Sequence, residues 1–302
     1  MFKVQWLRLG GSVAHTLMRR YAYGDNFVLY IPKKNGNKNP RCFLKGRGGC
    51  SDIITREHYI SHKLLNIVNQ DGKSVDITGL HWIPKDKLKG IGKANLVSNI
   101  LCKEHNSNLS PLDSHVGSFV EAIHRIDKGL LANDKGSLCF EFDGRAIEQW
   151  LIKTLVGLVE SKNIKARDGT DYIYSDKCIK LLCEPRVKWP KGWGLYVQVP
   201  DGHIHHANSF ELIPMYSETD LCIRGIKVKF NGFSMVLVVG VPCDSSKLGL
   251  HRPMELQFKK DSITHKIKLN WPSIERVKPQ FITFTQVGSY QGIHPAQNLE
   301  RA

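Results

Sequence analysis

The sequence predicts an α+β fold, with a small metal-stabilised module ahead of a β-rich carboxy-terminal domain that contains one long amphipathic helix. Cysteine and histidine residues recur in short pairs within the first third of the chain, as in modules held by a metal ion. Residues 146–159 place apolar side chains at helical spacing, and from about residue 183 the pattern alternates as it does in strands. At 302 residues the chain is long enough for two domains.

Basic residues are concentrated at the amino end. The chain carries 43 Lys and Arg against 28 Asp and Glu, a formal net charge of +15. Residues 1–49 hold ten Lys or Arg and a single acid, Asp25. This balance favours a polyanionic partner, because neutralising phosphates releases their condensed counterions. We therefore predict a basic amino-terminal extension over residues 1–40, which ends in a segment rich in turn residues.

Two folded parts are predicted after this extension, residues 41–128 and residues 129–302. Apolar residues at helical spacing predict a helix over residues 112–126 of the first part. The strongest amphipathic pattern, over residues 146–159, predicts a long helix near the start of the second part. Strands are predicted at residues 138–142, 194–199, 223–230, 233–241, 254–258 and 265–269. Asn231-Gly232, between two of these strands, is typical of a hairpin turn.

Four residues are candidate ligands for a structural zinc ion: Cys42, Cys50, Cys102 and His105. Such sites take four Cys or His ligands, usually as two short-spaced pairs. The second pair, Cys-x-x-His, has that spacing, whereas the first pair is wider. The glycines at 46, 48 and 49 would let the loop between the first two cysteines fold back on itself. The alternative is two unrelated buried cysteines and a surface Cys-x-x-His.

Three residues near this frame are candidates for hydrolytic chemistry. A nuclease that combines a metal with a histidine needs an imidazole to accept a proton from water and oxygen ligands for a divalent ion. Glu57 and His58 are adjacent in the sequence and supply a carboxylate and an imidazole. Asn106 directly follows the second ligand pair, so zinc binding would hold its amide near that frame. The alternative is a surface or capping histidine.

Two segments resemble a known nuclease family. They read Cys50-Ser-x-x-Ile-x-Arg-Glu-His-Tyr-Ile-Ser61 and Leu101-Cys-x-x-His-Asn-x-x-Leu-Ser-Pro-Leu-Asp113. Together they resemble an HNH endonuclease module of the His-Me finger (ββα-metal) class, in a divergent bacterial family of uncharacterised proteins. The resemblance covers about seventy residues, a quarter of the chain. It implies a zinc-stabilised ββα-metal module in residues 41–128.

The resemblance also implies roles for individual residues. His58 would be the general base, and Glu57 and Asn106 would hold a catalytic Mg²⁺ or another divalent cation. The flanking Cys and His residues would hold structural zinc. The family's middle asparagine lies about five residues before the cysteine, but here Asn99 is three residues before Cys102. Asn95 is seven residues before it, so neither aligns with the pattern. Of the two, Asn99 is the candidate for this catalytic position.

Residues in and just before the long helix offer a superficial match to a second nuclease class. Glu141, Asp143, Glu148 and Lys153 superficially resemble the acidic-acidic-lysine arrangement of that class. We interpret the helix at 146–159 instead as a core-packing helix whose polar face is solvated. A phosphate-binding GxxxxGK[ST] loop is absent from the sequence, which argues against NTP hydrolysis.

The expected function is therefore that of a metal-dependent endonuclease that hydrolyses nucleic-acid phosphodiesters. DNA is favoured over RNA as the substrate, and the expected form is double-stranded DNA. The resemblance implies a role in prokaryotic defence or in a mobile or phage element. One alternative is a non-catalytic, zinc-stabilised nucleic-acid-binding protein whose nuclease motif has decayed. Another is an interaction module whose basic surface binds an acidic protein, and the carboxy-terminal domain is a candidate for a protein partner or for homo-oligomerisation.

The sequence also bears on the location of the protein. Every apolar run is shorter than the roughly 20 residues that cross a bilayer, so no membrane association is expected. The amino terminus has scattered arginines and no clean apolar core, which makes it a poor signal peptide. Eight cysteines without dense spacing are typical of ligands or core thiols rather than of a secreted disulfide framework. We expect a cytoplasmic protein.

Overall fold

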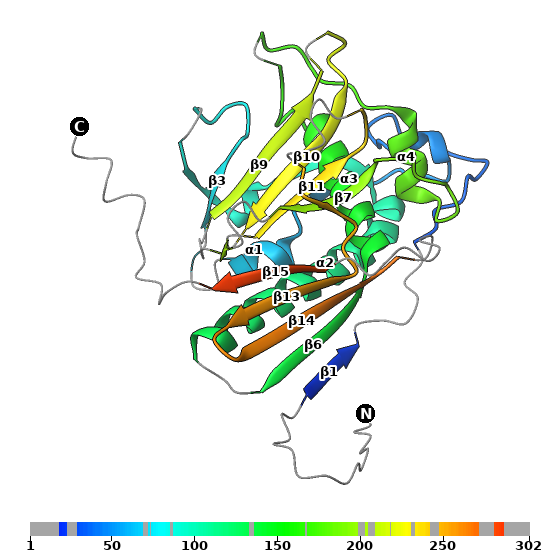
Figure 1. Ribbon diagram of the computed structural model, residues 1–302. Helices are drawn as coiled ribbons and strands as arrows, with labels where there is room; N and C mark the ends of the chain where they lie inside the picture. Colours follow the sequence, from blue (N-terminus) through cyan, green and yellow to red (C-terminus); the bar gives the residue numbers. More distant parts are fainter. Residues whose placement is uncertain are drawn as a thin grey trace, which may run out of the picture.

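The computed structural model describes residues 18–22, 29–68, 72, 74–84, 87–132, 136–166, 168–198, 203–204, 209–217, 219–230, 233–241, 248–271 and 281–286. Within these residues the chain forms two large β-sheets, one two-stranded sheet and four α-helices, a mixed α+β fold as predicted (Figure 1). Most of the predicted amino-terminal extension, residues 1–17 and 23–28, lies outside the described residues.

The first large sheet has six strands in the order β1–β6–β14–β13–β15–β8. Their bounds are β1 Met18–Ala22, β6 Ser137–Asp143, β14 Ile263–Asn270, β13 Glu255–Lys260, β15 Phe281–Gln286 and β8 His203–Ile204. The strands predicted at 138–142, 254–258 and 265–269 are confirmed as β6, β13 and β14. Strand β1 pairs in parallel with β6 and attaches part of the predicted extension to this sheet.

The second large sheet has seven strands in the order β12–β7–β11–β10–β9–β3–β4. Their bounds are β12 Leu250–His251, β7 Gly194–Gln198, β11 Phe233–Val238, β10 Ile223–Phe230, β9 Ser209–Tyr216, β3 Ser74–Thr78 and β4 Lys89–Gly92. The antiparallel pairing of β10 with β11 confirms the predicted hairpin, although Asn231 and Gly232 themselves lie outside the described residues. Strands β3 and β4 join this sheet through the parallel pairing of β3 with β9.

Helix α2, Lys103–Leu131, is longer than the helix predicted at 112–126. The sequence signal began only after Pro111, which has no N–H to donate to the carbonyl of Ser107. The hydroxyl of Ser110 donates to that carbonyl instead, at 2.9 Å, and the helix continues through the proline. The helix also crosses the predicted boundary at residue 128 and packs against α3 and the strands of the six-stranded sheet.

Helix α3, Gly144–Glu160, is buried along almost its entire length. Asp143 caps its first turn by accepting hydrogen bonds from the backbone N–H groups of Arg145 and Ala146. The helix contacts α2 and strands of both large sheets, so it has little solvent-facing surface. Our interpretation of its polar face as solvated is therefore wrong, because Glu148 and Lys153 are 0% and 2% exposed. Both charged side chains need buried partners.

One hydrophobic core extends from the first third of the described residues to the carboxy-terminal strands. Aromatic side chains connect its parts: Phe119 of α2 packs edge-on against Phe142 of β6 and Phe233 of β11. Phe233 in turn contacts Phe284 of β15. The candidate module and the β-rich part of the chain thus share their core.

Candidate functional site

Two short strands and the start of α2 carry the four predicted catalytic residues, Glu57, His58, Asn99 and Asn106. Strand β2, Ile54–His58, pairs antiparallel with β5, Val97–Cys102, and α2 begins at the next residue. The register shifts between the pairs Thr55–Leu101 and Glu57–Ser98, which leaves one extra residue on β5. Such a bulge bends a strand and redirects its side chains. Helix α1, His62–Val68, follows β2 and packs against α2.

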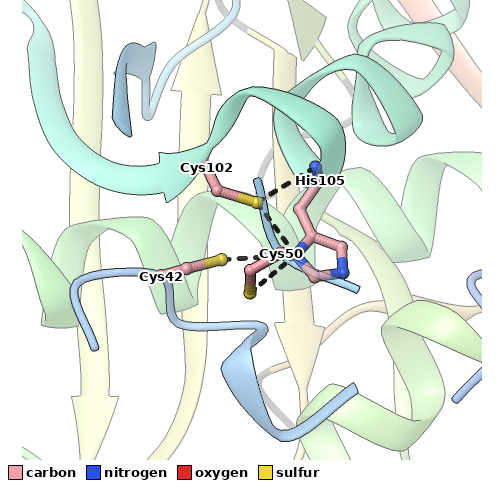
Figure 2. A group of neighbouring side chains, drawn as sticks. All are labelled: Cys42, Cys50, Cys102 and His105. Atoms are coloured by element: carbon pink, nitrogen blue, oxygen red, sulfur yellow. Dashed lines mark hydrogen bonds between the residues drawn. The ribbon is translucent and has the colours of Figure 1, made fainter. Parts of the chain in front are cut away.

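The four predicted zinc ligands converge at the junction of β5 and α2. The sulfur atoms of Cys42, Cys50 and Cys102 and a ring nitrogen of His105 lie within 4.8 Å of one another, and all four residues are buried. The Nδ1 atom of His105 is 3.3, 3.6 and 3.3 Å from the three sulfurs in that order, and Figure 2 shows the sulfurs pointing toward the ring. Tetrahedral zinc with bonds of about 2.3 and 2.0 Å separates sulfur from nitrogen by about 3.5 Å. The donor types and their separations therefore fit a zinc ion.

The cluster is also part of the secondary structure. Cys102 is the N-cap of α2, and its sulfur accepts a hydrogen bond from the backbone N–H of His105 at 3.5 Å. Burial raises the pKa of Cys42 to about 12. Burial also opposes ionisation of Cys102, but hydrogen bonds from the backbone of His105 and Ser51 outweigh it and lower the pKa of that thiol. Bound zinc would keep the thiols ionised, since the thiolate is the metal ligand.

Glycines fold the wide loop between Cys42 and Cys50, as the sequence suggested. Gly48 and Gly49 have φ of 68° and 66°, in the left-handed region that glycine adopts without strain. A Cβ added at Gly48 would lie 1.9 Å from the backbone oxygen of Lys34. The neighbouring Arg47 carbonyl accepts a hydrogen bond from the Lys34 N–H at 2.7 Å. The loop therefore packs directly on the segment that precedes it.

Gly48→Ala is expected to weaken zinc binding and to lower the free energy of unfolding by about 2 kcal/mol or more, because the new methyl group meets backbone and φ is unfavourable. Gly46→Ala is the matched control, since a Cβ at Gly46 meets nothing within 4 Å and its φ is not positive. Chemical denaturation and competition with a chromophoric zinc chelator measure the two effects. Equal behaviour of the two variants would contradict this account of the loop.

Glu57 lies in a buried cluster of charges with two residues from the helices. Its carboxylate forms an ion pair with Lys153 of α3, and the Lys153 Nζ atom is also 2.5 Å from Oδ2 of Asp113 on α2. Burial raises the pKa of Glu57, and Lys153 opposes that rise. Burial alone would lower the pKa of Lys153, but Asp113 and Glu57 outweigh it and raise that pKa. The lysine is therefore charged in the folded protein. We call these three residues the Glu57–Lys153–Asp113 cluster.

His58, the last residue of β2, lies beside this cluster. Its Nε2 atom is buried and has no hydrogen-bond partner among the described residues. Its ring centroid is 5.1 Å from that of His62. Burial is the main cause that lowers the pKa of His58, and the neighbouring His62 lowers it further. The ring is therefore neutral near pH 7 and able to accept a proton.

Asn106, in the first turn of α2, lies close to the same strand. Its Nδ2 atom donates to the hydroxyl of Thr55 at 2.9 Å, and a hydrogen bond from Asn106 also lowers the pKa of Glu57. The amide and the two carboxylates of the Glu57–Lys153–Asp113 cluster are oxygen donors, which Mg²⁺ prefers. The donor chemistry therefore fits a hard divalent cation, although a lysine ammonium already contacts both carboxylates.

Asn99 lies in a different place from the other predicted catalytic residues. It is exposed on β5 and lines an open cleft of about 490 Å³ together with Arg56, Asn95, Ser98, Glu160 and Ser161. Successive side chains on a strand point to opposite faces, so Arg56 faces this cleft while Glu57 faces the buried lysine. Asn99 thus lies beside Arg56 and not beside Glu57.

Sequence reasoning did not assign a role to Asp113 or Lys153. Asp113 closes the second motif segment, and it is ordered by a hydrogen bond from the indole N–H of Trp150 at 3.2 Å. Lys153 is three residues after Trp150, on the same face of α3. The sequence does contain a signal for Lys153, because it is a charged residue in a largely apolar stretch of helix. That signal does not identify its partners.

Comparison with known protein families, with curated proteins and with solved structures finds no match to this chain. Among the described residues, no helix combines the length and the apolar character needed to cross a membrane.

Proposed function

We propose that the protein is a metal-dependent endonuclease that hydrolyses nucleic-acid phosphodiesters, with double-stranded DNA as its substrate. One observation carries the proposal: an antiparallel pair of strands, β2 and β5, leads into α2, with a zinc-type ligand cluster at their junction and His58 at the end of β2. This is the order of elements that the ββα-metal resemblance implies. The net charge of +15 supports a polyanionic substrate.

The chemistry assigned to the residues follows from their surroundings. Nε2 of His58 is unpartnered and its ring is neutral, so it would accept the proton of an attacking water. Glu57 and Asn106 would hold a divalent cation, and Asn106 is fixed by its contact with Thr55. When bound there, Mg²⁺ would stabilise the charge that develops on the phosphate and on the leaving 3′ oxygen. The zinc cluster would keep the end of β5 and the start of α2 rigid.

The decisive experiment compares cleavage by the wild type and by His58→Ala. Zinc-loaded wild type is expected to nick or linearise supercoiled plasmid in Mg²⁺, and His58→Ala is expected to be slower by about 10²–10⁴-fold, the contribution of a positioned general base. His81→Ala is the control, because His81 is exposed and its Nδ1 atom lies 3.1 Å from the backbone oxygen of Asn163. Absence of cleavage by the wild type, or equal rates for wild type and His58→Ala, would overturn the proposal.

The second candidate is a non-catalytic, zinc-stabilised nucleic-acid-binding protein, and one observation favours it. The ammonium group of Lys153 contacts both carboxylates that flank the proposed cation position. A protein that had lost its catalytic metal would need such a buried cation to compensate Glu57. This candidate predicts salt-sensitive DNA binding without Mg²⁺-dependent cleavage. Fluorescence anisotropy with labelled duplex, read at several salt concentrations beside the cleavage assay, separates the two.

A further inference from the structure

We propose that Lys153 is an internal cation that competes with a divalent metal ion for Glu57 and Asp113, and that Asp113 is an additional oxygen ligand of that ion. The inference rests on the proposed function only in taking Glu57 as a ligand of a divalent cation. It assigns a role to Asp113 of α2 and Lys153 of α3, which are not among the predicted catalytic residues or metal ligands. In this arrangement the lysine holds the carboxylates in place until the metal ion displaces it.

The first support is burial. The side chains of Lys153 and Glu57 are 2% and 6% exposed, whereas that of Asp113 is 25% exposed. An unpaired charge so far from solvent is strongly unfavourable, so a buried carboxylate that is to stay ionised requires a cation near it. Lys153 meets that requirement within the protein itself. The greater exposure of Asp113 places the solvent-accessible side of the cluster at α2.

The second support is that each carboxylate is held in position by the protein. Oδ2 of Asp113 accepts from Lys153 at 2.5 Å, while its Oδ1 accepts from the indole N–H of Trp150 at 3.2 Å. Glu57 is fixed by the strand pairing of β2 with β5 and by its ion pair with Lys153. Carboxylates from two elements therefore face one position occupied by a cation. Oxygen donors in such an arrangement are what Mg²⁺ or Mn²⁺ would bind.

The third support is the count of charges. Two ionised carboxylates facing one ammonium leave the cluster with one negative charge in excess. A divalent ion would balance both carboxylates, and then the ammonium would have to withdraw from at least one of them. The lysine side chain is a flexible four-carbon stem, so its head group is able to move while its backbone stays in α3. Competition between the two cations follows from the shared carboxylates.

Removing the lysine tests the inference directly, without nucleic acid and without a cleavage assay. Zinc-loaded Lys153→Met is expected to bind Mn²⁺ at least about tenfold more tightly than the wild type, because a buried pair of carboxylates is left without its cation. The loss of the free Mn²⁺ signal in electron paramagnetic resonance measures the affinity. Added Mg²⁺ is also expected to raise the melting temperature of this variant more than that of the wild type.

Two controls define the site. Lys162→Met removes an exposed lysine that pairs with Asp171, and it is expected to bind Mn²⁺ as the wild type does. Asp113→Asn in the wild-type background is expected to weaken Mn²⁺ binding by about tenfold or more, as loss of a ligand or its close support does. Because Lys153 is retained there, this variant keeps the inference testable even if Lys153→Met does not fold.

Equal or weaker Mn²⁺ affinity in folded Lys153→Met than in the wild type would overturn the inference, as would unchanged affinity in Asp113→Asn. These outcomes are distinct from failure of the proposed function. Cleavage that depends on His58 together with unchanged Mn²⁺ affinities would leave the nuclease proposal standing and remove only the competition. Tighter Mn²⁺ binding by Lys153→Met without any cleavage by the wild type would support the competition and overturn the nuclease proposal.

Discussion

Replacing Cys102 by serine is expected to abolish zinc binding and to lower the free energy of unfolding by on the order of 5 kcal/mol or more, since structural zinc contributes roughly 10–16 kcal/mol of apparent binding energy in small modules. Two losses combine at this residue. Its sulfur is one of the four converging ligands, and the same atom caps the first turn of α2. Metal analysis by mass spectrometry and thermal unfolding by circular dichroism measure the two effects.

Cys183→Ser is the matched control for this prediction. Cys183 is also fully buried, but it lies in α4, Asp176–Cys183, away from the four ligands. Its substitution is expected to cost about 1–3 kcal/mol for a buried polar group and to leave zinc at one ion per chain. If Cys102→Ser retained wild-type zinc content, or if purified wild type contained no zinc, the assignment of the cluster would be wrong.

The zinc prediction extends to the catalytic proposal because the same elements carry both. Cys102 ends β5, β5 pairs with β2, and β2 carries Glu57 and His58. Loss of the metal would release the end of β5 and the first turn of α2, including Asn106. We therefore expect a chelator that removes zinc to abolish Mg²⁺-dependent cleavage, and re-addition of zinc to restore it as far as refolding permits.

The parts of the fold that follow from local signals could be predicted from the sequence. The Cys-x-x-His pair is brought together by a single turn. The glycines between Cys42 and Cys50 lie within the loop whose conformation they determine. In the hairpin of β10 and β11, Phe230 pairs with Phe233, only three residues later in the sequence. In each case the partners are close in sequence, so the pattern of a few residues contains the information.

Long-range pairings could not be predicted in the same way. Lys153 is 40 residues from Asp113 in the sequence and still farther from Glu57, and the residues next to it in the sequence do not indicate either partner. The pairing of β3 with β9 joins residues near 77 to residues near 210. The buried polar face of α3 was misinterpreted for the same reason, because the polar–apolar pattern of a helix does not reveal which other elements cover it.

Glu148→Ala is the second change expected to have a large effect, and it acts on another buried charge of α3. Glu148 is 0% exposed and accepts two hydrogen bonds from the guanidinium of Arg252, at 2.7 and 3.1 Å. It also accepts the backbone N–H of Leu195 in β7 at 2.8 Å. The residue therefore connects α3 to the seven-stranded sheet and to the segment that carries Arg252.

Burial raises the pKa of Glu148 against the opposing effect of Arg252, so taking this carboxylate out of water is costly even with its partner present. A buried pair of this kind adds little net stability, but removing one partner leaves the other uncompensated and costs about 3–5 kcal/mol. We expect Glu148→Ala to lower the free energy of unfolding by about that amount, measured by urea denaturation. Glu148→Gln, which can still accept the Leu195 N–H, is expected to cost less.

A double-variant comparison tests whether the loss comes from the pair itself. Glu148→Ala combined with Arg252→Ala is expected to cost clearly less than the sum of the two single changes, because neither charge is then left alone. Asp171→Ala, which removes an exposed carboxylate paired with Lys162, is the control and is expected to leave the free energy of unfolding close to that of the wild type. Additive costs for Glu148 and Arg252 would mean that packing, and not the uncompensated charge, determines the stability of this contact between α3 and the sheet.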